Sequence, residues 1–334
     1  MPGRPHFFLS VLSFLLLGAA GLAAGVGYGA YLYLSPGPLE APQLVLIERG
    51  SGVSKISQTL EDQNVITHAL LFKVAARLTG LHGSLKAGEY QFPAGVSVAD
   101  ALLMLHEGDV YDRKVTIPEG LTSYQIVQIL AGVDELQGEV PDIPPEGSLL
   151  PETYRFVTGD TKAGKLREMQ SAMDAVLAEL WPARAEGLPF ETKEQALVLA
   201  SIVEKETAVP SERARIAGVF VNRLKRGIPL QTDPSVIYAL TQGKVKNEGQ
   251  GPLGRRLLLK DLKTDSPYNT YRYAGLPPGP IANPGRASLE ATLHPEAHEY
   301  VYFVADGTGG HVFAKSLAEH NRNVLKWRKI RRNR

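Results

Sequence analysis

The sequence predicts an α+β protein built from a single transmembrane helix, a small α/β region and a larger, mainly helical domain with a β component. Residues 7–34 carry no charge. Short β-type runs alternate with amphipathic helical segments over residues 44–143, and residues 144–334 contain several longer helical patterns and one clear strand. The predicted parts are an N-terminus (1–6), a transmembrane helix (7–34), a spacer (35–43), the α/β region (44–143) and the helical domain (144–334).

The composition excludes several classes of function. The chain has 36 Lys and Arg against 35 Asp and Glu, a net charge of +1, so no overall field attracts nucleic acid. It has no cysteine, which excludes disulfides, thiol catalysis and zinc–cysteine sites. The basic residues 326–334 are expected to be the solvated end of a last helix.

The uncharged segment from Phe7 to Leu34 is long enough to cross about 30 Å of hydrocarbon. Arg4 precedes it and residues 35–40 contain no Lys or Arg, so a cytoplasmic N-terminus is predicted. The chain is then a single-pass protein of the inner membrane, with its C-terminal domains on the outer, periplasmic side. A cleaved signal peptide is the alternative, because residues 18–20 are small. The apolar run continues past them, which favours a retained anchor.

A weak internal repeat organises the region after the spacer. Each copy has a β-type run, a turn glycine and an amphipathic helix. Such units resemble LysM modules, which bind glycans that contain N-acetylglucosamine; a small α/β adaptor without a ligand is the alternative. The copies are Ile47-x-x-Gly50, Phe92-x-x-Gly95 and Ile117-x-x-Gly120.

The second half begins after a proline-rich segment, residues 141–147. Periodicity and capping residues predict helices separated by loops that are rich in Gly, Pro, Tyr and Asn. Asp233 is expected to be an N-cap with Pro234 at the first helical position. The expected elements are helices at 165–180, 193–207, 211–227, from 233 and 311–327, and a strand at 300–304.

Two carboxylates lie at the end of the helix expected at residues 193–207. A glutamate in an apolar helix costs free energy, and desolvation raises its pKa toward the range of a general acid. At 100° per residue Glu204 and Glu206 point about 160° apart, so they cannot flank one bond. One of them is catalytic or neither is. Glu204 is the candidate catalytic acid, because the small side chain of Ala200 one turn before it leaves room for a substrate; a buried structural glutamate is the alternative. Glu206 is expected to pair with a basic group such as Arg213 or Arg215.

Six motifs stand in register along the chain: residues 200–207 (Ala-Ser-Ile-Val-Glu-Lys-Glu-Thr), 230–238, 266–271, 275–285, 302–306 and 310–313. They resemble those of the endolytic murein transglycosylases, the YceG-like family. The resemblance covers the whole chain, from the anchor through a LysM-like region to the catalytic domain. One segment, Leu150-Pro151-Glu152-Thr153-Tyr154, departs mildly from the usual Phe-Pro-Asp-Thr-Tyr.

The resemblance implies cleavage of the β-1,4 bond between N-acetylmuramic acid and N-acetylglucosamine in nascent glycan strands. The product is a 1,6-anhydro-muramyl end, and strand elongation stops. One carboxylate is enough for this reaction, because Glu204 protonates the leaving oxygen and then accepts the proton of the sugar's own C6 hydroxyl. The family also implies peptidoglycan synthases and division or elongation proteins as partners, and no cofactor.

Other residues of the motifs are candidates for binding the sugar. Polar groups could bind acetamido and hydroxyl groups, and tyrosines could stack on sugar faces. Asp233 has a helix cap as its alternative role. His294 and His298 lack the His-Glu-x-x-His order, so no metal site is expected. The candidate substrate-binding residues are Gln231, Thr232, Asp233, Tyr238, Asn269 and Tyr271.

Two rival functions stay open on the sequence alone. The first is a hydrolase in which Asp233 activates water opposite Glu204, because glycosidases commonly use two carboxylates. The second is a glycan-binding scaffold of the cell-wall synthesis machinery.

Overall fold

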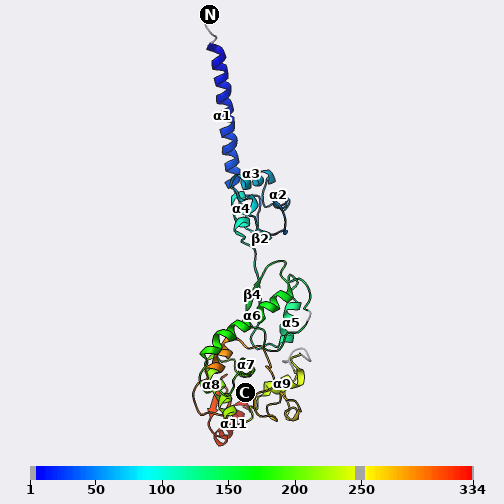
Figure 1. Cartoon of the computed structure of the whole chain (residues 1–334), viewed down its shortest axis with the longest axis vertical. Helices are drawn as coiled ribbons and strands as arrows, with labels where there is room; N and C mark the ends of the chain where they lie inside the picture. The colour runs from blue at the N-terminus through cyan, green and yellow to red at the C-terminus, as the bar shows by residue number, and fades with distance from the viewer. Residues whose placement is uncertain (1–4, 141, 245–252, 333–334) are drawn as a thin grey trace. The chain divides into compact units, whose positions relative to one another are not determined.

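The computed structural model describes residues 5–140, 142–244 and 253–332, and the chain divides into two compact units (Figure 1). The first unit is Met1–Arg113 and the second is Lys114–Arg334. Most of the predicted cytoplasmic N-terminus, residues 1–4, lies outside the described residues.

The first unit begins with a long apolar helix, α1 (Pro5–Leu34). Within it, Leu12–Leu34 is a stretch of 23 residues that is long and apolar enough to cross a membrane. The helix has the length and composition of the predicted anchor. The elements that follow are β1 (Gln43–Ile47), α2 (Val53–Asp62), α3 (Ala69–Leu78), η1 (Leu81–Gly83), β2 (Gly88–Phe92) and α4 (Val98–Glu107).

A small core holds these elements together. Strands β1 and β2 pair antiparallel, with Val45 opposite Tyr90. Helices α2, α3 and α4 bury apolar side chains against this ribbon, among them Leu60, Phe72 and Leu105. A two-stranded ribbon needs such helix packing, because alone it is marginally stable in water.

The three predicted strand–turn–helix units are confirmed as elements. The turn glycines Gly50, Gly95 and Gly120 have φ of 80°, 67° and 75°, a left-handed conformation that glycine adopts without steric cost. Each is followed by a helix, α2, α4 and α5 (Ser123–Ala131) respectively. The structure does not identify these units as a LysM fold.

The domain boundary differs from the predicted one. The third strand–turn–helix repeat belongs to the second compact unit of the chain, because β3 (Arg113–Thr116) pairs with β4 (Thr153–Phe156) across the proline-rich segment. Helix α5 shares a hydrophobic cluster with residues from both sides of that segment, including Leu149 and Phe156. The predicted break after residue 143 therefore falls inside a folded unit, and the chain divides at Arg113 and Lys114 instead.

The second unit is mainly helical, with a second strand pair near its end. Strands β5 and β6 form an antiparallel hairpin, with Phe303 opposite Phe313. After β3, α5 and β4 the elements are α6 (Lys162–Leu180), η2 (Trp181–Ala183), α7 (Lys193–Glu206), η3 (Pro210–Glu212), α8 (Arg213–Lys225), α9 (Asp233–Thr241), η4 (Asp261–Lys263), α10 (Arg286–Leu293), β5 (Tyr302–Ala305), β6 (His311–Ala314) and α11 (Leu317–Arg332).

Helix α7 is the central helix of this unit, as its apolar composition predicts. It contacts α8, α9 and α10, and it lies among the surrounding helices in Figure 1. Seven of the eight residues of α7 from Ala196 to Val203 are buried. Its start is fixed by a capping box in which Thr192 and Gln195 exchange side-chain and backbone hydrogen bonds. The two candidate carboxylates, Glu204 and Glu206, therefore lie at the end of a capped, largely buried helix.

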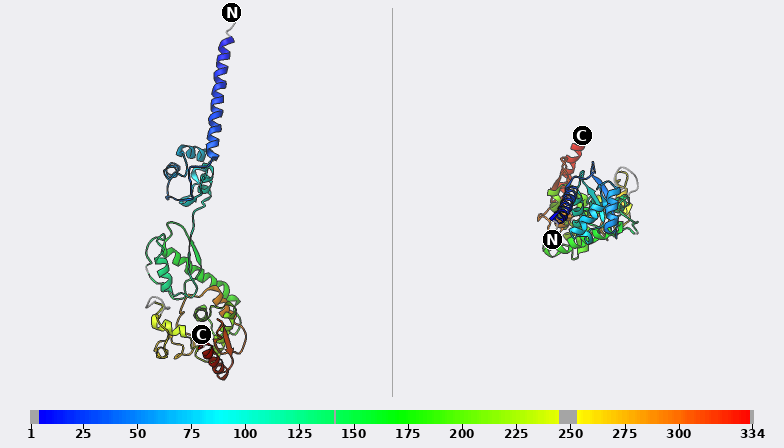
Figure 2. Two further views of the ribbon diagram at one scale, coloured as in Figure 1. Left: turned by 180° about the vertical axis from the view of Figure 1, so that it is seen from behind. Right: turned by 90° about the horizontal axis from the view of Figure 1, so that it is seen from above.

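The last predicted helix is partly wrong. Residues 311–314 form β6, and the helix begins only at Leu317, because the alternating apolar side chains of 311–314 pair with β5. Figure 2 shows α11 against this hairpin, in agreement with its contacts to both strands.

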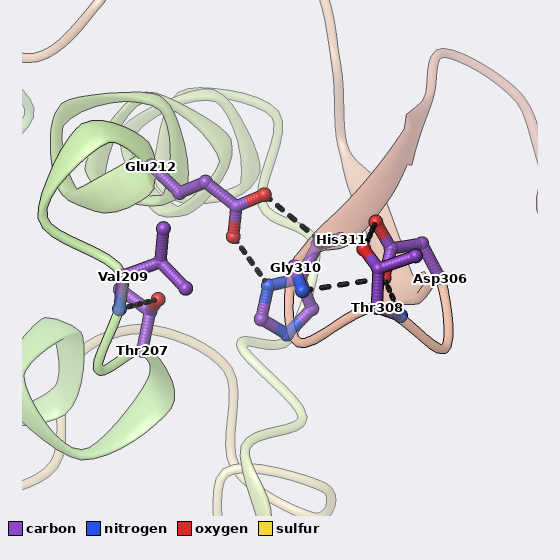
Figure 3. Close-up of polar contacts among 7 residues, drawn as sticks. All are labelled: Thr207, Val209, Glu212, Asp306, Thr308, Gly310 and His311. Atoms are coloured by element: carbon purple, nitrogen blue, oxygen red, sulfur yellow. Dashed lines mark hydrogen bonds and ion pairs between the residues drawn. The ribbon is translucent and has the colours of Figure 1, made fainter.

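The hairpin is tied to the start of α8 (Figure 3). The backbone N–H of His311 donates to Glu212 Oε1 at 2.8 Å, and His311 Nδ1 lies 2.7 Å from Glu212 Oε2. Asp306 Oδ1 accepts from the N–H of Thr308 at 2.6 Å, which closes the hairpin turn. The helix predicted from residue 211 begins two residues later, because Pro210–Glu212 form a 3-10 turn and α8 starts after Glu212.

Candidate active site

The two carboxylates at the end of α7 sit where the helix dipole disfavours negative charge. Glu204 and Glu206 are in the last turn of the helix, whose C-terminal end carries partial negative charge. Each carboxylate therefore depends on groups from other elements. The structure places those groups on two separate sides of the helix.

Glu204 is desolvated and held by two neighbours. Its side chain is only 7% exposed. Glu204 Oε2 accepts a hydrogen bond from the N–H of Gly285 at 3.0 Å, and Oε1 lies 3.9 Å from Arg213 Nη2. Both contacts complement a carboxylate, as the base form of a general acid requires.

A second carboxylate, Glu119, shares this cluster and was not found from the sequence. Its Oε2 lies 3.7 Å from the same Nη2 of Arg213, so one guanidinium faces both glutamates. Burial raises the pKa of Glu119, and the charge of Glu204 raises it further, while Arg213 acts in the opposite direction. The sequence signal that could have identified Glu119 is its place directly before the turn glycine Gly120. The sequence analysis assigned this segment only to a turn.

The cluster has no space for a side chain at position 285. A Cβ added to Gly285 would lie 1.8 Å from Glu119 Oε1, far inside van der Waals contact. Gly285 is also the residue whose N–H binds Glu204. Close approach of backbone to both carboxylates explains a glycine here, although its φ of −75° would suit any residue. The loop at 275–285 is thus part of the site and more than a rigid connection.

Arg213 occupies the position between the two glutamates because α8 begins there. Its side chain is 12% exposed, and its Nε is buried without a hydrogen-bond partner among the described residues. The preceding residue, Glu212, binds His311 and thereby fixes the first turn of α8. The prediction that Glu206 pairs with Arg213 or Arg215 is wrong, because Arg215 pairs with Glu296 at 2.9 Å.

Glu206 lines a different cavity, of about 570 Å³. Burial raises the pKa of Glu206. Three of the predicted substrate-binding residues, Gln231, Asp233 and Tyr271, line this same cavity. Tyr271 donates its hydroxyl to Asp233 Oδ1 at 2.6 Å. The predicted cap role of Asp233 is not observed, since Thr232 is the N-cap residue of α9.

The backbone of Gln231 is strained. Its φ is 49°, which non-glycine residues adopt at a cost in free energy, and its N–H donates to the carbonyl of Thr270 at 3.1 Å. Such strain is common at functional sites, because it fixes a side-chain direction that relaxed backbone would not give.

The remaining predicted residues lie elsewhere. Tyr238 lines a smaller cavity of about 200 Å³ together with Lys205, and its ring centroid is 4.9 Å from that of Tyr268. Thr232 and Asn269 are buried, with exposures of 1% and 0%. Both amide donations of Asn269 go to backbone carbonyls, which supports the loop around it rather than contact with a sugar.

Metal ligands do not gather in the described part of the chain, residues 5–140, 142–244 and 253–332. There, no group of three or more His, Asp or Glu side chains is placed to hold a metal ion. His298 instead binds the backbone carbonyl of Arg215 through Nε2 at 2.9 Å. The candidate site is therefore one of carboxylates, an arginine and tyrosines.

The sequence and fold can be compared with known proteins. An endolytic murein transglycosylase of Bacillus subtilis (strain 168) is 34% identical over 341 residues, which cover 90% of each chain. One of Streptococcus pneumoniae serotype 2 (strain D39) is 32% identical over 376 residues, and the match covers 95% of this chain and 64% of the relative. A crystallised YceG-like protein of Listeria monocytogenes is 33% identical, with a TM-score of 0.49 over 85% of this chain and 99% of that one.

The two curated relatives define the class of the chain, that of the endolytic murein transglycosylases. Residues 45–326 also match the YceG-like family. The chain belongs to the YceG-like family, which confirms the resemblance recognised from the motifs.

Proposed function

We propose that this protein is a membrane-anchored endolytic murein transglycosylase that cuts nascent glycan strands and so ends their elongation. Glu204 donates its proton to the oxygen that links N-acetylmuramic acid to N-acetylglucosamine, and the C1–O bond breaks. The C6 hydroxyl of the same muramic acid attacks C1 and gives its proton to the Glu204 carboxylate. A 1,6-anhydro bond forms, no water is consumed, and Glu204 returns to its acid form.

The observation that carries this proposal is the desolvated cluster around Glu204. The side chain of Glu204 is 7% exposed, and the neighbouring Glu119, although 44% exposed, has a pKa raised by partial burial and by the charge of Glu204. Arg213 and the Gly285 N–H then stabilise the carboxylate after proton transfer. The cluster thus suits both the acid and the base step of a reaction with one proton-transferring residue.

We assign sugar-binding roles to those predicted residues whose side chains line a cavity. Gln231, Asp233 and Tyr271 offer polar atoms in the larger cavity, and Tyr238 offers an aromatic face in the smaller one. Thr232 and Asn269 hold the loops that carry these residues. In the first unit, a groove of about 300 Å³ between β1 and α2 would serve a LysM-like glycan contact, with Glu48 and Lys55 in its lining.

The location and the partners are also part of the proposal. The lack of Lys and Arg at residues 35–40 favours placing both units on the outer side of the inner membrane. Nascent glycan is made there, so peptidoglycan synthases and division or elongation proteins are the proposed partners.

The rival hydrolase needs a second carboxylate opposite Glu204 to activate water. Asp233 lines the same cavity as Glu206, and its charge raises the pKa of Glu206. It therefore belongs to the Glu206 side of α7 and not to the Glu204 cluster, which disfavours the rival. A wild-type digest of purified sacculi decides between them: we expect 1,6-anhydro-muramyl ends, whereas new reducing ends would overturn the proposal. A glycan-binding scaffold would release no fragments at all beyond those seen with Glu204→Gln.

A further inference from the structure

Helix α3 in the first unit carries an apolar face that its own core does not use. Leu70, Val74 and Leu78 follow one another at four-residue spacing, so they lie on one face of the helix. They are 69%, 45% and 83% exposed. The opposite face of α3 is buried in the core through residues such as Phe72 and Ala76. Three large exposed apolar side chains in a row mark an interaction surface more often than isolated ones do.

This face borders a groove whose other wall is the membrane-spanning helix. The groove, of about 560 Å³, is lined on the α1 side by a run from Gly21 to Tyr33 and on the α3 side by residues that include Val74 and Leu78. Its lining residues are almost entirely apolar or glycine. Because α1 ends at Leu34 and rises about 1.5 Å per residue, Gly21 lies about 20 Å from that end.

The glycines of α1 leave this groove open. Gly21, Gly25 and Gly29 lie on one face of the helix, and a Cβ added to any of them would meet nothing within 4 Å. The glycines are therefore not used for close packing of α3 on α1. The space that they leave lies at the depth of the hydrocarbon if Leu12–Leu34 spans the bilayer.

Basic side chains lie beside the apolar face. Lys73 and Arg77 are four residues apart on one flank of α3, between its buried face and its exposed apolar face; Lys73 is half-buried and Arg77 is exposed. An apolar face flanked by Lys and Arg is the arrangement of helices that lie in a membrane interface, with the cations at the level of anionic headgroups.

We propose that α3 lies in the leaflet nearer Leu34, with phospholipid acyl chains filling the groove between α1 and α3. The lipid surface is the occupant because the groove continues the surface of the membrane-spanning helix itself. The proposal rests on the proposed anchor function of α1. It makes α3 a second membrane contact, which holds the first unit against the bilayer instead of leaving it on a free stalk.

The chain has no cysteine, so single cysteines can be introduced and labelled without altering others. We would label Leu70→Cys and Leu78→Cys with a small fluorophore in the full chain, reconstituted in vesicles of phosphatidylethanolamine and phosphatidylglycerol. Lipids that carry a quencher on the acyl chain report contact with hydrocarbon, and iodide reports contact with water. Leu46→Cys in β1 is the matched control, since Leu46 is an exposed leucine (46%) of the same unit on another element.

We expect labels at 70 and 78 to be quenched by the lipid-borne group at a depth of about 5–10 Å, and label 46 to be quenched only by iodide. Iodide quenching at 70 and 78 equal to that at 46 would overturn the proposal. Self-quenching at 78 that survives dilution of the protein in lipid would show a second copy in the groove and would also overturn it.

A further label, Ala24→Cys, separates this proposal from the anchor itself. Strong lipid quenching at 24 with none at 70 and 78 would leave the anchor intact and remove only the interfacial role of α3. Loss of lipid quenching at 24 as well would overturn both.

Discussion

The two glutamates at the end of α7 are separated by one residue, yet their surroundings are opposite in character. Glu204 is buried and meets a cation, a backbone N–H and a second, partly exposed carboxylate. Glu206 lines a wide polar cavity and has neither Arg213 nor Arg215 as an ion-pair partner. The comparison teaches that the geometry of the helix alone directs two neighbouring glutamates into different surroundings. The candidate for proton transfer is thereby kept apart from the carboxylate that borders the polar cavity. The pair of Glu119 and Glu204 suits proton transfer, whereas Glu206 is a buried carboxylate at the wall of a polar cavity.

The largest expected effect breaks this comparison directly. Glu204→Gln removes the acid and the base, so we expect release of anhydro-muropeptides from sacculi to fall by about 10²–10⁴-fold. Glu206→Gln is the matched control on the same helix, and we expect it to retain most of the turnover. Equal losses in both variants, with unchanged thermal unfolding, would assign catalysis to the cavity side instead.

The second prediction concerns the glycine that touches both carboxylates of the cluster. In Gly285→Ala, the new methyl group would collide with Glu119 and displace the backbone N–H that binds Glu204, and a shift on the order of 1 Å at Glu204 costs about 10²-fold in rate. The matched control is Gly132→Ala, where an added Cβ finds its nearest neighbour at 3.6 Å and φ is −81°. Product release by Gly285→Ala at the wild-type rate would show that Glu119 is not needed in its present position.

A smaller effect is expected in the pH profile when Arg213 is changed. Arg213 lowers the pKa of Glu119, so Arg213→Met should let the cluster keep its proton to higher pH. The alkaline limb of the activity profile should then move to higher pH, whatever the loss in maximal rate. Arg213→Lys keeps the charge, and its limb should stay near that of the wild type. A limb that moves to lower pH in the methionine variant would contradict the assignment.

Much of the local structure was predictable, because it depends on residues close in sequence. The apolar composition of α7 predicted a central helix, and the spacing of Glu204 and Glu206 predicted that they diverge. The turn glycines Gly50, Gly95 and Gly120 predicted strand–turn–helix units, because glycine adopts the left-handed backbone conformation of such turns without steric cost.

Contacts between distant segments were not predictable from the same signals. Glu119 meets Glu204 only because β3 pairs with β4 and leads Gly120 to the end of α7. That pairing also puts the division between the compact units at a different place from the predicted boundary, since local proline content does not reveal which strands pair across it. Asn269 shows the converse: a motif amide that suited sugar binding is used to hold backbone carbonyls.

The smallest expected effect tests the electrostatics of α7 itself, through two glutamates at its opposite ends. The pKa of Glu206 is raised by burial, so its contribution to stability is present at low pH and is lost as pH rises through its folded-state pKa. The pKa of Glu194 is lowered, chiefly by a backbone hydrogen bond at the start of the helix, so its contribution is present at neutral pH and is lost on acidification. Thermal unfolding between about pH 3 and pH 8 therefore should show opposite trends relative to wild type. Glu206→Gln should gain in Tm as pH rises, and Glu194→Gln should lose. If both variants followed the wild-type curve in parallel, the carboxylates would be equally solvated at the two ends of the helix, and the desolvated character of its C-terminal end would have to be abandoned.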